Sequence, residues 1–312
     1  MLPNTDELAE LLLDLAVPHQ DIEEAVRLSR RVTSDPETLR ILEKAVTDLV
    51  RDMGRIRGTT AAVPALPDPS TATARFFPLY VFVAALPHIR AHHRERGIPD
   101  EVSRHTLADV GRCVAWYRRW HGTGGLLIPE WLTLHFHGEL YQLGRLQFQR
   151  SRIGGRTGAS IAAAGLPHGP GDPGLAVHIP DFMGPLTPQA VERSFALARA
   201  FFARHYPEET YAVATCSSWL LDPQLKRHLP ADSNIVRFQE RFHPSRLPTH
   251  PAAPAASETP AVPDDMEPVR FVFGTTDVPL DRLPRRTVLE RAVLDHLREG
   301  GHWYVGRGWL EL

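Results

Sequence analysis

Several features that define whole classes of protein are scarce or missing in this sequence. It has two cysteines, Cys113 and Cys216, without a CxxC spacing, which argues against a disulfide framework and a cysteine-ligated zinc or iron-sulfur site. No run approaches 18 uninterrupted apolar residues, and the most apolar stretch, residues 76–89, contains two prolines. We therefore predict a buried helix there and no membrane span. The N-terminus is acidic where a signal peptide would be basic, so we expect a cytoplasmic protein.

The sequence also lacks an excess of charge of either sign. With 35 Lys and Arg against 37 Asp and Glu, the formal net charge is -2, so neither nucleic acid nor an anionic membrane is expected as a partner. An anionic ligand would have to be met by a local site. The 312 residues, of which 43% are hydrophobic and 23% charged, suit a globular protein of one large or two modest domains.

The first 120 residues have the periodicity of helices. Residues 4–56 contain three helical patterns, with start signals at Asn4-Thr5-Asp6 and Ser34-Asp35-Pro36. Two further patterns cover residues 76–96 and 103–120. We therefore predict a helical N-terminal domain over residues 1–120 and a second domain over residues 121–312.

Two histidines and a carboxylate, His135, His137 and Glu139, lie in a further predicted helix from Pro129 to about Gly144. Such a set can form a catalytic zinc site. Residues two apart on a helix point in different directions, so the two imidazoles would not reach one ion without distortion. We predict no metal site.

A strand, a helix and a second strand are predicted between residues 174 and 219. Apolar residues at positions 175, 177 and 179 alternate with Ala176 and His178, which predicts a half-buried strand that ends at Pro180. Thr187 is a good N-cap and Pro188 suits the first helical position, so a helix should begin there. Its predicted apolar stripe consists of Val191, Phe195, Ala198 and Phe202. The second strand covers residues 211–219.

Weaker patterns predict the rest of the second domain. We predict strands over residues 144–153, 235–242, 269–273 and 303–310, a helical turn from Asp222, and a helix over residues 287–299. Residues 154–174 and 244–268 are rich in Gly, Pro and Ala and are predicted as connections, the second of them disordered. The GGRTG in the first connection lacks the GK[ST] ending of a phosphate-binding loop, and no helix is predicted after it.

Two blocks of sequence resemble a known family. They are HIPDFMGPLTP at residues 178–188 and ATCSSWLLDPQLKRHLPADSNIVRFQERF at residues 214–242. Both are similar to the C-terminal domain of a family of bacterial two-domain acyltransferases, in which a helical domain precedes a domain like that of the GNAT N-acyltransferases. The resemblance covers nearly the whole chain. It implies an α/β (α+β) fold with a helical N-terminal domain and a GNAT-like mixed, mostly antiparallel sheet with flanking helices.

The resemblance also implies where a donor would bind. Acyl-CoA would be a co-substrate, with no tightly bound cofactor, and its thioester would lie where the strands over residues 175–180 and 211–219 splay apart. Its pyrophosphate would lie at the N-terminus of the helix that begins near Pro188. The implied donor-binding residues are Ile179, Phe182, Met183, Gly184, Leu186 and Thr187. This segment departs from the usual GNAT pattern of a basic or amide residue followed by spaced glycines, because it offers Gly184 alone and two prolines without an N–H. An acyl carrier protein therefore stays open as the donor.

Acylation of an amine requires a neutral nitrogen, and a histidine can accept the proton near cytoplasmic pH. His178 is the candidate base, and a structural histidine hydrogen-bonded to a neighbouring strand is the alternative. Asp181 is the second candidate. Cys216, Ser217 and Ser218, near the end of the facing strand, could protonate the leaving thiolate or orient the thioester. A covalent role for Cys216 is disfavoured because GNAT chemistry is direct transfer.

We therefore predict an acyl-CoA-dependent N-acyltransferase that moves an acyl group to an amine acceptor by direct transfer. The alternative, from a different class, is a catalytically inactive GNAT-like module that binds acyl-CoA or a partner protein as a sensor or scaffold. Steady release of free thiol in the presence of acceptor would separate the two. Hydrolysis by the TCSSW segment is a weaker hypothesis because the segment has no GxSxG elbow.

Overall fold

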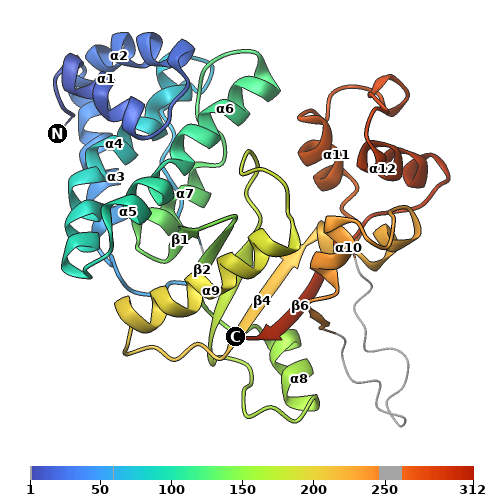
Figure 1. Cartoon of the computed structure of the whole chain (residues 1–312). Coiled ribbons are helices and arrows are strands. Elements are labelled where there is room, and N and C mark those ends of the chain that lie inside the picture. Colours follow the sequence, from blue (N-terminus) through green and yellow to red (C-terminus); the bar gives the residue numbers. More distant parts are fainter. Residues whose placement is uncertain (1, 59, 246–261) are drawn as a thin grey trace. The chain divides into compact units, whose positions relative to one another are not determined.

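The chain folds as two units, Met1–Gln142 and Leu143–Leu312. The computed structural model describes residues 2–58, 60–245 and 262–312 (Figure 1). The helices of the first unit are α1 (Thr5–Asp14), α2 (His19–Ser34), α3 (Pro36–Val50), α4 (Ala72–Glu95), α5 (Asp100–Leu107), α6 (Asp109–His121) and α7 (Pro129–Phe136). The boundary expected at residue 120 precedes α7. Because α7 packs against α3, α4, α5 and α6, it belongs to the helical unit.

Helix α4 is the buried centre of the first unit, as predicted for residues 76–89. It contacts α2, α3 and α7, and Phe76, Phe77 and Phe82 are fully buried in the same apolar cluster. By length and composition alone α4 could cross a membrane, but 61% of its most apolar window is buried within the protein. Burial in the core accounts for its apolar composition.

The second unit is built on a sheet that begins with β1 (Leu140–Leu143), at the boundary. Its other elements are β2 (Leu146–Arg152), α8 (Gly155–Ala163), β3 (Pro173–His178), α9 (Pro188–His205), β4 (Val213–Ser218), the 3₁₀ turns η1 (Trp219–Leu221) and η2 (Pro223–Arg227), α10 (Asn234–Gln239), β5 (His243–Pro244), α11 (Met266–Phe273), the 3₁₀ turn η3 (Leu280–Arg282), α12 (Val288–Arg298) and β6 (Gly306–Glu311).

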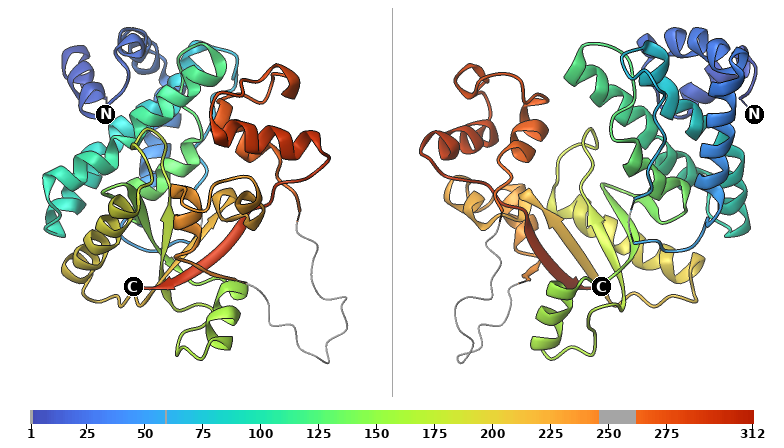
Figure 2. Two further views of the ribbon diagram at one scale, coloured as in Figure 1. Left: turned by 45° about the vertical axis from the view of Figure 1, so that its right-hand side comes forward. Right: turned by 180° about the vertical axis from the view of Figure 1, so that it is seen from behind.

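The described strands form one mixed sheet in the order β1-β2-β3-β4-β6-β5. Strand β3 pairs parallel with β4, whereas β2 with β3, β4 with β6 and β5 with β6 pair antiparallel. Helix α8 packs beside β6 (Figure 2). The predicted mixed, mostly antiparallel sheet with flanking helices is confirmed.

Helix α9 connects the two parallel strands across one face of the sheet. Its Phe195 packs edge-on against Phe148 of β2, with ring centroids 5.4 Å apart. Thr187 caps the helix through an Oγ1 that accepts the Ala190 N–H at 3.2 Å, and Pro188 is the first helical residue. The start of this helix is therefore as predicted.

The prediction of a strand over residues 235–242 is wrong, because this segment contains α10. Its N-cap is Ser233, whose Oγ accepts the Val236 N–H at 3.3 Å. Phe238 packs against Phe242, which lies just after the helix, with ring centroids 5.1 Å apart. The cap and this contact outweigh the strand preference of the β-branched pair at residues 235–236.

Three other local predictions are also wrong. The helix predicted from Pro129 to about Gly144 ends at Phe136, and residues 140–143 form β1. Residues 269–273, predicted as a strand, belong to α11, which ends at Gly274 in a left-handed conformation. Residues 154–174, predicted as a connection without a helix, contain α8, whose N-cap is Gly154. In the predicted loop over residues 244–268, residues 246–261 lie outside the described part of the chain.

An ion pair between the buried Arg150 and the half-buried Glu209 joins β2 to the segment that precedes β4. Arg150 Nε and Nη2 donate to the two carboxylate oxygens of Glu209 at 2.8 and 2.5 Å, and the guanidinium lies 4.0 Å from the centre of the Tyr206 ring. The Tyr211 hydroxyl donates to the same carboxylate. Burial alone would raise the pKa of Glu209, but the hydrogen bonds from Arg150 and Tyr211 outweigh it and hold this pKa below its ordinary value.

We predict that Glu209→Gln lowers the free energy of unfolding by about 3 kcal/mol, because it leaves the buried Arg150 without its counter-charge. A depressed carboxyl pKa adds stability that is complete above the unfolded-state pKa, about 4.3, and is lost as the pH falls through the folded-state pKa. Denaturant unfolding from pH 7 to pH 3 should therefore show a smaller acid loss in the variant. Glu192→Gln, which removes an exposed pair with Arg241, is the control and should cost less than about 1 kcal/mol. Equal losses in the two variants would contradict the assignment.

Candidate active site

The pairing of β3 with β4 stops before either strand ends. The register pairs Leu175 with Ala214, Ala176 with Thr215 and Val177 with Cys216. Strand β3 continues along β2 as far as residue 178, and β4 continues along β6 as far as residue 218. The ladder between the two parallel strands therefore ends at Val177 and Cys216. This end of the ladder, called the opening below, lies at the carboxyl ends of both strands, where ligands of such sheets bind.

The register determines which candidate residues share a face of the sheet. Paired residues of parallel strands point to the same side, and alternate residues point to opposite sides. Ala176 and Thr215 therefore define one face, which also carries His178 and Ser217 beyond the last pair. Cys216 lies on the opposite face. The structure thus brings His178 and Ser217 to the same side of the opening and separates both from Cys216.

His178 is held by a polar residue of β2 that the sequence analysis did not assign to the site. Its Nε2 lies 3.0 Å from Gln149 Oε1, and Gln147 is its direct partner across the antiparallel pair. When Nε2 donates to the amide oxygen, the neutral ring carries its basic lone pair on Nδ1. Gln147 and Gln149 are buried, and their alternation with the apolar residues at 146 and 148 was the signal for this polar face.

The other candidates on β4 have less suitable surroundings. Cys216 is buried, and burial raises the pKa of its thiol to about 12. The thiol therefore stays protonated at neutral pH, which disfavours a nucleophilic role. The Ser218 Oγ accepts the Leu220 N–H at 3.1 Å and so caps η1. Ser217, by contrast, is exposed.

The predicted donor-binding segment forms the loop from β3 to α9. Phe182 has φ 60° and a side chain that is 59% exposed, and a left-handed backbone at a bulky residue costs about 1–2 kcal/mol. Gly184 has φ 76°. Leu186 is buried, whereas the remaining predicted donor and base candidates here are half-buried, namely Ile179, Asp181, Met183 and Thr187.

The first turn of α9 adds one donor that the sequence analysis missed. Pro188 has no N–H, and Thr187 accepts the N–H groups of Ala190 and Val191 through its side chain and its carbonyl. The Gln189 N–H is left without a partner among the described residues. The Gln189 N–H and the positive end of the helix dipole can together bind an anion.

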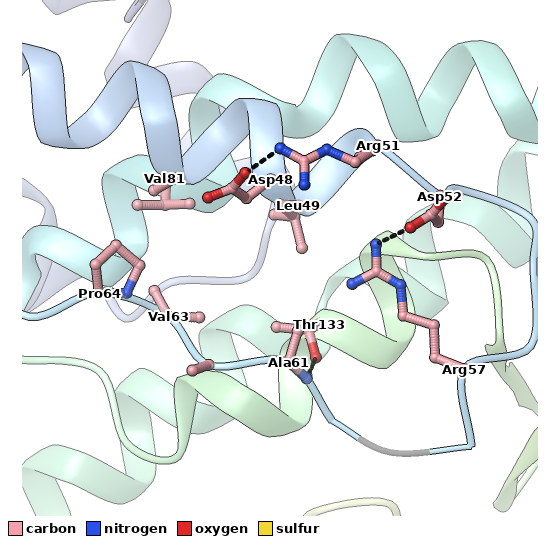
Figure 3. A pocket seen from close by; sticks show the side chains of 12 residues that line it. Asp48, Leu49, Arg51, Asp52, Arg57, Ala61, Val63, Pro64, Val81 and Thr133 are labelled. Atoms are coloured by element: carbon pink, nitrogen blue, oxygen red, sulfur yellow. Dashed lines mark hydrogen bonds and ion pairs between the residues drawn. The ribbon is translucent and has the colours of Figure 1, made fainter.

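A pocket of about 210 Å³ lies in the first unit, between α3 and the segment that follows it (Figure 3). Arg51 and Arg57 line it, and each is paired with an aspartate, Asp48 at 2.5 Å and Asp52 at 3.4 Å. These arginine charges are already compensated, so the pocket is a weaker candidate for an anionic ligand than the start of α9.

His135, one of the two histidines considered for zinc, takes part in a structural ion pair. His135 Nε2 lies 2.9 Å from Asp109 Oδ2, and Arg112 and Trp131 donate to the same carboxylate at 2.5 and 2.9 Å. Within the part of the chain that the structure describes, no group of three or more His, Cys, Asp or Glu could hold a metal ion.

Comparison with known proteins agrees with this geometry. Residues 6–138 match the family model of an N-acyltransferase N-terminal domain, and residues 140–310 match that of a GNAT-like C-terminal domain. No curated protein sequence matches the chain. An acyltransferase solved in complex with decanoyl-CoA and teicoplanin has a TM-score of 0.86 and 40% identity, over 100% of this chain and 90% of that chain. A mutant acyltransferase in complex with octanoyl-CoA has the same TM-score and coverage at 39% identity. The chain therefore belongs to the family of acyltransferases that combine an N-acyltransferase N-terminal domain with a GNAT-like C-terminal domain.

Proposed function

We propose that this protein transfers an acyl group from acyl-CoA directly to an amine of a second substrate. The observation that carries the proposal is the opening between β3 and β4, with His178 at its edge and the start of α9 at the same ends of the strands. Solved relatives bind octanoyl-CoA and decanoyl-CoA, which supports acyl-CoA as the donor. One relative holds teicoplanin together with decanoyl-CoA. That complex supports an acceptor bound beside the donor, as direct transfer requires.

The residues on the polar face suit the proton transfers of this reaction. The neutral amine attacks the thioester carbonyl, a C–N bond forms, and the C–S bond of the donor breaks. His178 accepts the proton that the amine loses. Ser217, on the same face of β4, is our candidate to protonate the leaving thiolate, and it would regain a proton from water. Asp181, in the turn after β3, is the second candidate base.

The donor would be held mainly at the loop from β3 to α9. The helix dipole and the Gln189 N–H favour the negative charge of the pyrophosphate. Exposed apolar surface at Phe182 would cover the pantetheine arm. The chain as a whole is close to neutral, so this affinity depends on local contacts and not on the net charge.

We predict that saturating acyl-CoA raises the melting temperature, because a ligand that binds only the folded state stabilises it by mass action. At a hundred times the dissociation constant, the stabilisation is about 2.7 kcal/mol. Inorganic phosphate at the same concentration is the control and should have little effect. If acetyl-, octanoyl- and decanoyl-CoA all left the melting temperature unchanged, CoA would not be the donor, and an acyl carrier protein would be tested next.

We predict that His178→Ala lowers kcat by about a hundredfold or more and leaves donor binding nearly unchanged, the usual scale for a lost acid-base group. In the wild type the donor-saturated rate should rise with pH through an apparent pKa near that of histidine, and this limb should vanish in the variant. His168→Ala, in the connection before β3, is the matched control. A variant with lower thermal stability, full rate and an unchanged pH limb would show that His178 is only structural.

A second variant tests the contact between His178 and Gln149. In Gln149→Glu, a carboxylate beside the imidazole favours the protonated ring, so the pKa of His178 should rise. Because the neutral ring is the active form, the rising limb of the rate should move to higher pH and the rate at pH 7 should fall. Gln149→Leu carries no charge, so its limb should stay near the wild-type position. A pH profile that is the same in all three proteins would exclude His178 as the titrating base.

A further inference from the structure

The loop from β3 to α9 is held in an unusual conformation. Phe182 and Gly184 both have positive φ. Gly184 adopts this conformation without steric cost because it has no Cβ, whereas Phe182 does not. A strained residue persists where its surroundings determine the backbone, and such strain is concentrated at ligand-binding sites. Something outside the loop must therefore fix the conformation of Phe182.

That contact comes from Arg145, in the turn between β1 and β2. Its Nη1 donates to the Pro180 carbonyl at 2.9 Å, and its Nε donates to the Gly184 carbonyl at 2.8 Å. The two carbonyls flank Phe182 on either side. One guanidinium thus spans the strained part of the loop.

The backbone of the turn between β1 and β2 is hydrogen-bonded to α9. The Arg145 N–H donates to Ser194 Oγ at 2.8 Å. Gly144, with φ 72°, approaches so closely that an added Cβ would lie 2.8 Å from the same Oγ. Arg145 therefore has a fixed position relative to both the loop and the helix.

We propose that Arg145 is the positioning residue of the donor site, an inference that rests on the proposed function. The loop itself lacks the basic residue and the spaced glycines that usually form a phosphate cradle, and Arg145 replaces them from a neighbouring turn. A carbonyl and the N–H of the same trans peptide point in opposite directions. By holding the Pro180 carbonyl, Arg145 directs the Asp181 N–H away from the guanidinium. It also adds a positive charge close to the start of α9.

The geometry requires arginine in particular. A guanidinium is a planar fork that can donate to two carbonyls at once, whereas the ammonium of lysine is a single compact point of charge. Arg145→Lys should keep the charge but hold the loop less well. Arg145→Gln removes the charge and can reach at most one of the two carbonyls.

The test measures the affinity for CoA by calorimetry and the steady-state kinetics of thiol release for both variants. For Arg145→Gln, the dissociation constant of CoA and the KM for acyl-CoA should rise about tenfold or more, with kcat at saturating donor within about twofold of the wild type. For Arg145→Lys, the dissociation constant of CoA and the KM for acyl-CoA should lie between those of the wild type and those of Arg145→Gln. The pH limb of the rate should stay in place, because His178 is retained.

Arg152→Gln is the matched control. Arg152 is the last residue of β2, whereas Arg145 directly precedes the first. Arg152 also donates to a loop carbonyl, that of Gly171 at 3.4 Å, but it pairs with Pro173 at the start of β3, and the donor loop follows the end of β3. A second control uses an S-acyl pantetheine, which carries the thioester without the phosphates. If Arg145 positions the phosphate-binding groups, the KM for this shorter donor should be nearly equal in the wild type and in Arg145→Gln.

The outcomes separate this inference from the proposed function. Unchanged CoA affinity in a folded Arg145→Gln, or equal losses in Arg145→Gln and Arg152→Gln, would overturn the role of Arg145 while the wild type still bound CoA. An equal rise in KM for both donors would also overturn it, because the effect would not depend on the phosphates. Absence of CoA binding by the wild type would overturn the donor assignment itself, and the role of Arg145 with it.

Discussion

The parallel pairing of β3 with β4 is the constraint on which the rest of the second unit depends. Two parallel strands cannot be joined by a tight hairpin, so the chain must cross the sheet before it returns. Helix α9 makes that crossing, and the loop of residues 179–187 joins the end of β3 to its N-terminus. The short three-residue ladder then stops at the same ends of the strands. Because β3 and β4 are parallel and α9 connects them, the opening, the N-terminus of α9 and His178 all lie toward the carboxyl ends of these strands.

The two faces of the sheet carry different side chains at that place. On the α9 side, Phe148 and Phe195 pack edge to face, and the thiol of Cys216 is buried and kept protonated. The opposite side carries Gln149 and His178. Under the proposed function, proton transfer would take place on the face that carries Gln149 and His178, and the face that carries Phe148 and Cys216 would pack against α9.

Much of this arrangement could be predicted from the sequence because its signals are local. The alternation around His178 and the cap at Thr187 depend on neighbours within a few residues, and both were identified correctly. The predictions of strands over residues 235–242 and 269–273 were wrong because β-branched residues produce a strand-like pattern there. The opposing helix signals are the N-cap at Ser233 and the C-cap at Gly274.

Other parts of the site had no local signal. The residue at which the β3 and β4 ladder ends follows from how three strands fit together, so no window of sequence contains it. The contacts of Arg145 join residues that are 35 and 39 positions apart. The bond between Gln149 and His178 spans 29 positions. Such long-range contacts are determined by tertiary packing, and alternation could indicate only that Gln149 belongs to a polar face.

Strand β6 has a consequence for how the sheet is completed. It lies between β4 and β5 in space, although residues 219–305 separate it from β4 along the chain. The pairing of β2, β3 and β4 uses nearer segments and should form earlier, since closing a longer loop costs more entropy. Until β6 arrives, β4 is an edge strand with unpaired backbone groups, the kind of edge that recruits other chains. A chain cut before Gly306 would expose the strand that carries Ser217, and self-association would then compete with folding.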